Sequence, residues 1–254
     1  MIDAILVTEG LSRRFGGLMA VNDVAIELVT GKLHAVLGPN GAGKTTLINL
    51  LSGELAASAG KVRYKGEDIT RLPPDRRSRI GIGRSFQKTN IFANFTAFEN
   101  CRLAAQSRIP RALHFASDVI AFPAVRAAAQ RALDAAGLAT RGDHVASTLS
   151  HGEQRQLEIA MVLATAPEVL LLDEPLAGMG AEEAARMVDL LKKITRDHAL
   201  LLVEHDMDAV FAVADRITVM VNGQVLESGT PEEIRASPAV RQAYLGDSAV
   251  AAAG

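Results

Sequence analysis

The sequence predicts an α/β fold in which helices cover a mostly parallel β-sheet. Three short apolar runs, at 33–37, 169–172 and 200–203, have the composition of fully buried strands. Helical stretches alternate with these runs, as expected for a parallel sheet. The clearest helix is 181–196, whose apolar side chains share one face: Ala184, Met187, Val188, Leu191 and Ile194.

Short strands near both ends of the chain predict an antiparallel β layer beside this core. They lie at 5–9, 24–28, 61–64, 217–221 and 224–227. The last two are joined by Asn222 and Gly223, a strong hairpin signal.

The stretch from 93 to 159 is rich in Ala and Arg, broken at Pro110 and Pro123, and we expect it to form an inserted helical subdomain. The α/β core with its antiparallel layer then comprises 1–92 and 160–248, and the Ala-rich 249–254 is expected to be a flexible tail. A last helix is expected after Thr230, which caps it in a capping box with Glu233.

Composition restricts the possible functions. The chain has 254 residues, 48% of them hydrophobic, so it can bury a large core. A net charge of −2, 4% aromatic residues and no Trp argue against nucleic-acid binding. Cys101 is the single cysteine, which excludes an internal disulfide and favours a reducing compartment. We expect neither a signal peptide nor a membrane span, so a membrane process would be served from the surface.

The strand at 33–37 leads into a phosphate-binding loop of the form Gly-x-x-x-x-Gly-Lys-Thr. Its residues are Gly38, Pro39, Asn40, Gly41, Ala42, Gly43, Lys44 and Thr45, with Thr46 next in the nucleotide-binding set. Glycines let backbone N–H groups point at phosphate, and the following helix adds its dipole. Lys44 is expected to reach the β- and γ-phosphates, and the Thr45 hydroxyl to bind Mg²⁺. The loop alone leaves GTPases, nucleotide kinases, helicases and transport ATPases open.

Two carboxylates end the strand at 169–172. Asp173 is expected to hold Mg²⁺ at the carboxyl end of the sheet. Glu174 follows and points differently, where it can orient or deprotonate the water that attacks the γ-phosphate. Beside a triphosphate, two acids require a metal ion to offset their charge.

A predicted helix start about twenty residues before Asp173 distinguishes between GTPases, nucleotide kinases, helicases and transport ATPases. Ser150 caps the helix and Glu153 completes a capping box, which by itself indicates no more than a well-capped helix. The functional interpretation is an anion site, because Ser150, the N–H of Gly152 and the helix dipole can together hold phosphate.

This helix start, Leu149-Ser150-His151-Gly152-Glu153, resembles the signature motif of ABC ATPases, and the motif order matches that family over nearly the whole chain. The resemblance implies a P-loop NTPase core of the ABC ATPase type that binds and hydrolyses ATP with Mg²⁺. It implies that Phe15 stacks on adenine and that Gln87 senses the metal, binding it with Thr45 and Asp173. It also implies a catalytic set of Lys44, Glu174 and His205.

The same resemblance implies a mechanism and partners. Each ATP lies between the P-loop of one cassette and the signature of a second, in a homodimer or heterodimer. The helical subdomain contacts transmembrane permease subunits, and a solute-binding protein acts indirectly. The location implied is cytoplasmic, peripheral on the inner face of the bacterial plasma membrane. Phe92, Phe95 and Phe98 in the insert can serve partner contact or core packing.

Finer motifs are similar to the ATPase subunit of branched-chain amino-acid importers, a subfamily that also serves urea and short amides. They lie at 14–18, 83–87, 92–100 and 229–231. Alternatives are a lipopolysaccharide-export ATPase or a soluble clamp on nucleic acid or ribosomes. Three positions depart from the family pattern: His151 replaces Gly, Glu153 replaces Gln, and Gly180 replaces an Asp whose side chain would communicate across the dimer.

Overall fold

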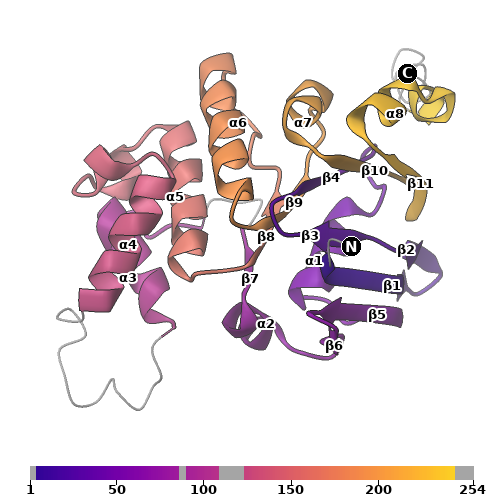
Figure 1. The fold of residues 1–254 in the computed structure, drawn as a ribbon, viewed down its shortest axis with the longest axis horizontal. Coiled ribbons are helices and arrows are strands. Elements are labelled where there is room, and N and C mark those ends of the chain that lie inside the picture. Colours follow the sequence, from indigo (N-terminus) through magenta and orange to yellow (C-terminus); the bar gives the residue numbers. More distant parts are fainter. Residues whose placement is uncertain (1–3, 86–89, 109–122, 244–254) are drawn as a thin grey trace.

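A computed structural model describes residues 4–85, 90–108 and 123–243. Its central element is a six-stranded sheet in the order β11-β10-β4-β9-β8-β7 (Figure 1). The strands are β4 (Leu33–Leu37), β7 (Ile82–Arg84), β8 (Val169–Asp173), β9 (Ala199–Val203), β10 (Arg216–Val221) and β11 (Gln224–Gly229). All neighbours pair in parallel except β10 and β11. Every residue of β4, β8 and β9 is buried, as their apolar runs predict.

A second sheet is antiparallel, in the order β2-β1-β5-β6, with β3 also pairing with β1. Its strands are β1 (Ala4–Phe15), β2 (Leu18–Val24), β3 (Glu27–Val29), β5 (Ala59–Tyr64) and β6 (Glu67–Asp68). The two kinds of sheet and their helices confirm the predicted fold class.

Two strand predictions are wrong in detail. The Asn222-Gly223 hairpin forms, but β10 pairs with β4, so the hairpin extends the six-stranded sheet and is not part of the antiparallel layer. The expected strand at 24–28 is split, because β2 ends at Val24 and β3 begins at Glu27.

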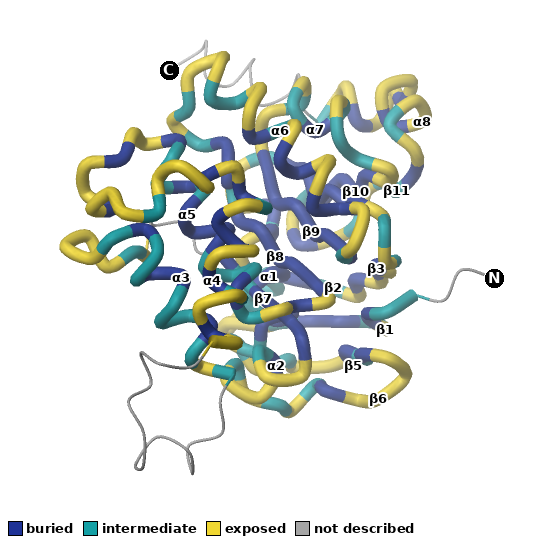
Figure 2. The backbone as a smooth tube through the Cα atoms, turned by 60° about the vertical axis from the view of Figure 1, so that its left-hand side comes forward, coloured by how far each residue is buried: buried dark blue, intermediate teal, exposed yellow. Residues whose placement is uncertain are grey.

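Helix α1 (Lys44–Ser52) fills the space between the two sheets (Figure 1). Its side chains Leu47 and Leu51 share one buried cluster with Leu6 of the antiparallel sheet and Leu171 of the six-stranded sheet. The opposite face of the six-stranded sheet is covered by α6 (Ala181–Thr195), α7 (Met207–Val213) and α8 (Pro231–Ala236). Figure 2 shows β8 and β9 buried at the centre of the molecule, whereas β6, at the edge of the antiparallel sheet, is exposed.

A helical region lies to one side of the sheets (Figure 1). It contains α3 (Ala97–Gln106), α4 (Pro123–Ala135) and α5 (His151–Ala164), with short 3₁₀ turns at Ala139–Arg141 and Ala146–Thr148. These helices share a separate buried cluster that includes Cys101, Leu133 and Leu157. The limits 93–159 for a subdomain stay a prediction. In the described ranges no helix is long and apolar enough to cross a bilayer.

Arg77, on the unpredicted helix α2 (Pro74–Ile80), ties α2 to the end of α1. The side chain is only 2% exposed, and its guanidinium donates to four carbonyls. Two belong to α1, Leu50 O at 2.8 Å and Leu51 O at 2.7 Å, and two to the preceding loop, Leu72 O at 3.0 Å and Thr70 O at 2.9 Å. Burial lowers the pKa of Arg77 to about 10, so the group is still charged at neutral pH. It therefore supplies donors to carbonyls in the last turn of α1, where helix geometry leaves few internal donors, and in the loop before α2.

We expect Arg77→Met to lower the free energy of unfolding by about 3 kcal/mol, because the buried carbonyls lose their donor. Urea unfolding followed by circular dichroism measures this change. Arg79→Met, at an exposed position on the same helix, is the matched control and should change stability by no more than about 0.5 kcal/mol. Equal stability of the two variants would contradict the role given to Arg77.

Candidate active site

The phosphate loop joins β4 to α1, as the sequence predicts. Gly38 and Gly43 have φ angles of +155° and +100°, which side chains rarely adopt. Gly43 caps α1 without a side-chain hydrogen bond, and the first turn holds no acidic residue. The amides of this turn therefore face the loop as donors, which is the arrangement that binds phosphate.

Lys44 lies against the loop that it follows. Its ammonium donates to Gly38 O at 2.6 Å and to Pro39 O at 3.0 Å, and the residue is 7% exposed. Burial lowers the pKa of Lys44, while the nearby carboxylates of Glu174, Asp173 and Glu204 act in the opposite direction. The cation is thus held among acids at the point where phosphate would enter.

Residues of this loop line an open pocket of about 490 Å³. The predicted nucleotide-binding residues that line it are Phe15, Asn40, Gly41, Ala42, Gly43, Lys44, Thr45 and Thr46, and the predicted catalytic residue Glu174 lines it as well. Phe15 is 43% exposed, and the Arg13 guanidinium lies 4.6 Å from its ring centre. One face of the ring is therefore used by Arg13, and adenine stacking by Phe15 stays a prediction.

Asp173 ends β8 and is 1% exposed. No described residue donates a hydrogen bond to either carboxylate oxygen, and Arg84 Nη2 lies 3.8 Å from Oδ2. Burial raises the pKa of Asp173, partly offset by Arg84. Buried carboxylate oxygens that accept no hydrogen bond fit a hard cation such as Mg²⁺. Mg²⁺ binding by Asp173 with Thr45 stays a prediction. The described residues contain no cluster of three or more His, Cys, Asp and Glu that could hold a metal by itself.

Glu174 and His205 lie together at the ends of β8 and β9. His205 Nδ1 is 3.9 Å from Glu174 Oε1 and 3.8 Å from Glu204 Oε2. The backbone of Glu174 has a φ angle of +49°, and its N–H donates to Val203 O at 2.9 Å. Because the backbone is left-handed at Glu174, the side chains of Asp173 and Glu174 leave it in different directions. This agrees with the separate roles predicted for them, metal binding for Asp173 and activation of water for Glu174.

Glu204 was not predicted as part of the site. It is fully buried and accepts hydrogen bonds from Leu176 N at 2.9 Å and His205 N at 3.2 Å. Burial raises the pKa of Glu204. The carboxylate joins the loop after Glu174 to the loop that carries His205, so it fixes the distance between them. The feature of the sequence that could have indicated Glu204 is its position next to His205 at the end of an apolar strand.

The signature residues begin α5 in the predicted capping box. Ser150 Oγ accepts from Glu153 N at 3.2 Å, and Glu153 Oε2 accepts from Ser150 N at 2.9 Å. Glu153 also pairs with Arg141 at 2.8 Å. The Ser150 N–H and then Arg141 lower the pKa of Glu153. Its charge is therefore engaged by the cap and by Arg141.

The signature and the phosphate loop line different pockets. Ser150, Gly152 and Glu153 line an opening of about 510 Å³ with Arg141 and Arg186. No residue of the phosphate loop takes part in it. The two sets of residues predicted to bind phosphate thus line two separate pockets in the part of the chain that the structure describes.

Two departures from the family pattern meet on the loop before α6. His151 Nε2 lies 3.2 Å from Ala177 O, so this nitrogen carries the proton and donates. Gly180 caps α6 without a side-chain hydrogen bond. The substituted His151 thus joins the signature to the loop after Glu174 within one chain.

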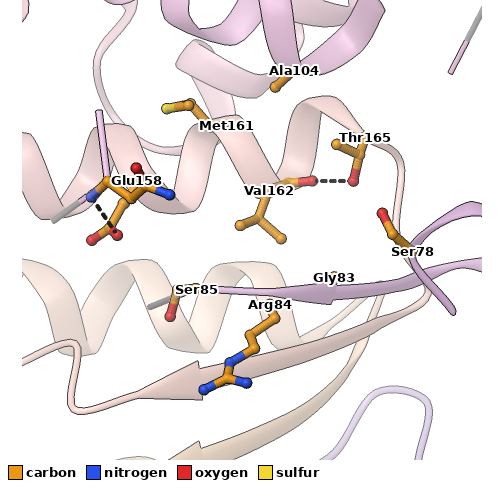
Figure 3. Close-up of a pocket in the computed structure, with 10 residues that line it drawn as sticks. Ser78, Gly83, Arg84, Ser85, Ala104, Glu158, Met161, Val162 and Thr165 are labelled. Carbon is orange, nitrogen blue, oxygen red and sulfur yellow. Dashed lines mark hydrogen bonds between the residues drawn. The ribbon is translucent and has the colours of Figure 1, made fainter. Parts of the chain in front are cut away.

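Gln87 lies outside the described residues, but the strand before it lines a pocket of about 190 Å³ against α5 (Figure 3). Glu158, Met161 and Val162 reach this pocket from α5, and the Arg84 guanidinium points away from the helix. Glu158 accepts from Asn90 N at 3.1 Å and pairs with Arg155 at 3.0 Å. This buried pair joins the segment after Gln87 to the signature helix.

Comparisons with known proteins agree with these features. The profile of the ABC transporter family matches residues 21–177. A second profile, branched-chain amino acid ATP-binding cassette transporter, matches residues 224–250. The chain is 40% identical to the high-affinity branched-chain amino acid transport ATP-binding protein LivG of Salmonella typhimurium, over 97% of this chain and 100% of the relative. It is 40% identical to BraF of Pseudomonas aeruginosa, which carries the same description, over 96% and 98%.

Solved structures give the same fold. A nucleotide-free ATP-binding cassette from an ABC transporter superposes with a TM-score of 0.85 at 28% identity, covering 95% of this chain and 99% of that one. The ADP conformation of another ABC transporter cassette gives 0.84 at 29% identity, covering 96% and 99%.

We expect Lys44→Ala to weaken ATP binding about 100-fold, because a charge-assisted hydrogen bond to phosphate is lost from a buried site. Titration of a fluorescent ATP analogue measures the affinity. Lys192→Ala removes an exposed lysine of α6 and should bind as wild type does. Binding by the Lys44 variant within twofold of the control would refute the placement of phosphate at this loop.

Proposed function

The chain belongs to the ABC transporter family and is an ATPase of that family, and from this we propose that it powers an importer of branched-chain amino acids or a related polar solute such as urea or an amide. The observation that carries the solute class is the 40% identity to two branched-chain amino acid transport subunits over nearly the full length of both chains. The match at residues 224–250 supports it independently. It favours an importer over lipopolysaccharide export or a soluble clamp.

We infer that two cassettes share each ATP. The phosphate loop and the signature line separate pockets in one chain, so a second chain must supply the missing half of each site. The second cassette is another copy or a paralogue. A triphosphate held between them becomes part of the interface, and its hydrolysis releases the pair.

Within each site the residues have distinct tasks. Lys44 and the first turn of α1 bind the β- and γ-phosphates. Glu174 positions and deprotonates the attacking water, and His205, 3.9 Å away, contacts the γ-phosphate. Thr45, Gln87 and Asp173 would hold Mg²⁺, which supplies charge neutralisation on the phosphates.

The helical region supplies the contact with permease subunits at the inner face of the plasma membrane. Phe92 and Phe95 are 53% and 40% exposed, and their rings stack with centres 5.6 Å apart. The buried Asn100 amide accepts from Phe92 N at 2.8 Å and donates to Phe92 O at 3.1 Å, which holds this loop in place. Phe98 packs against the helical core instead. A fixed pair of exposed aromatic rings suits an anchor for a partner helix.

We expect Glu174→Gln to form a dimer with Mg-ATP while turnover falls at least about 100-fold, because the variant binds nucleotide but lacks the base. Size-exclusion chromatography with light scattering measures the mass, and phosphate release measures turnover. Lys44→Ala treated in the same way should stay monomeric. A Glu174→Gln protein that binds ATP and stays monomeric would overturn the shared site.

We expect the double variant Phe92→Ser/Phe95→Ser to reduce co-purification with tagged permease subunits at least about tenfold, because two aromatic anchors are lost. ATP affinity should not change, since neither residue lines the nucleotide pocket. Leu226→Ser, which removes a 42% exposed apolar side chain from β11, is the control. Equal recovery of both variants with the permease would count against this docking surface.

A further inference from the structure

Glu183, on the first turn of α6, places its carboxylate on the signature motif. Oxygen Oε1 accepts a hydrogen bond from Ser150 Oγ at 3.1 Å and from Gly152 N at 3.2 Å. Glu183 lines the same pocket as Ser150 and Gly152. These are the two donors expected to hold the phosphate of an ATP carried by a second cassette.

The carboxylate and a phosphate cannot use these donors together. The Ser150 hydroxyl has one proton, and it is directed to Glu183 while the oxygen accepts from Glu153 N. A phosphate oxygen that reached Gly152 N would lie against Oε1, and two anions at such a distance repel each other. Engagement of phosphate therefore requires the Glu183 side chain to move.

The contact has the electrostatic character of an anion site. Hydrogen bonds from Ser150 and Gly152 lower the pKa of Glu183, so it is ionised at neutral pH. The start of the 14-residue helix α5 adds its dipole. The side chain is partly exposed on the surface of α6, so it can rotate into solvent, and in doing so it also gives up a hydrogen bond from the backbone N–H of Gly180 at the start of that helix.

We propose that Glu183 occupies the phosphate site of the signature in the separated cassette and is exchanged for the terminal phosphate of the ATP bound to the partner cassette. Glu183 thereby sets the ATP concentration at which two cassettes close. This inference rests on the proposed shared site. It gives Glu183 of α6, which belongs to neither the phosphate loop nor the signature, a role in the closure of the two cassettes.

The test measures ATP-driven dimerisation in the Glu174→Gln background, by light scattering across a Mg-ATP titration. Added Glu183→Ala should lower the half-saturating ATP concentration about five- to tenfold, because no internal anion competes. Added Glu183→Gln keeps the shape without the charge and should shift the midpoint in the same direction by less. Added Glu182→Gln is the control, since that side chain is 94% exposed and its nearest described partner is Arg186 at 3.9 Å.

The outcomes are distinct. A lower midpoint for both Glu183 variants, with the Glu182 control unchanged, supports the exchange, since loss of a purely structural contact would not tighten the dimer. A midpoint for Glu183→Ala that equals the control, or a higher midpoint for both variants, overturns it. If the Glu174→Gln parent does not dimerise at all, the shared site fails and this inference fails with it. A parent that dimerises without a shift refutes only the exchange.

Discussion

Two close backbone contacts hold the phosphate loop, and the rest of the site depends on them. A Cβ at Gly38 would lie 2.2 Å from Met220 O of the six-stranded sheet, and a Cβ at Gly43 would lie 2.2 Å from Ala20 O of the antiparallel sheet. Both distances exclude any side chain. Each sheet thus fixes one end of the loop, and the direction of the first turn of α1 follows from that clamp. The phosphate site is therefore a product of the packing of two sheets around one helix as much as of a local motif.

The features that the sequence predicted are those whose chemistry is local. The capping boxes of Ser150 with Glu153 and of Thr230 with Glu233 both form, because each depends on residues three positions apart. The buried strand β4 and helix α1 follow from an apolar run and a loop that turns it into a helix. For the same reason the Asn222-Gly223 turn was predictable.

The features that were not predictable depend on contacts between distant segments. The turn at Gly223 fixes a hairpin but not the sheet that it joins, which is decided by the pairing of β10 with β4. Strand β7 has three residues, which are too few to show the alternation of apolar and polar side chains that predicts a strand. Glu183 lies 31 positions from Gly152, and nothing in its neighbours indicates that it reaches the signature. Glu204 acts by joining two loops that only the sheet brings together.

The donors in both halves of the proposed site are hydrogen-bonded to acceptors within the chain. Lys44 donates to Gly38 O and Pro39 O, and Ser150 and Gly152 donate to Glu183. ATP therefore exchanges hydrogen-bond partners at each half and does not simply add them. At the phosphate loop the exchange replaces neutral carbonyls by a charged phosphate, which is a clear gain. At the signature it replaces one anion by another, so the gain is small. On the proposed mechanism, one chain would then bind ATP firmly, while the closed and open arrangements of two chains would have similar free energies. That suits an interface that must open in every cycle.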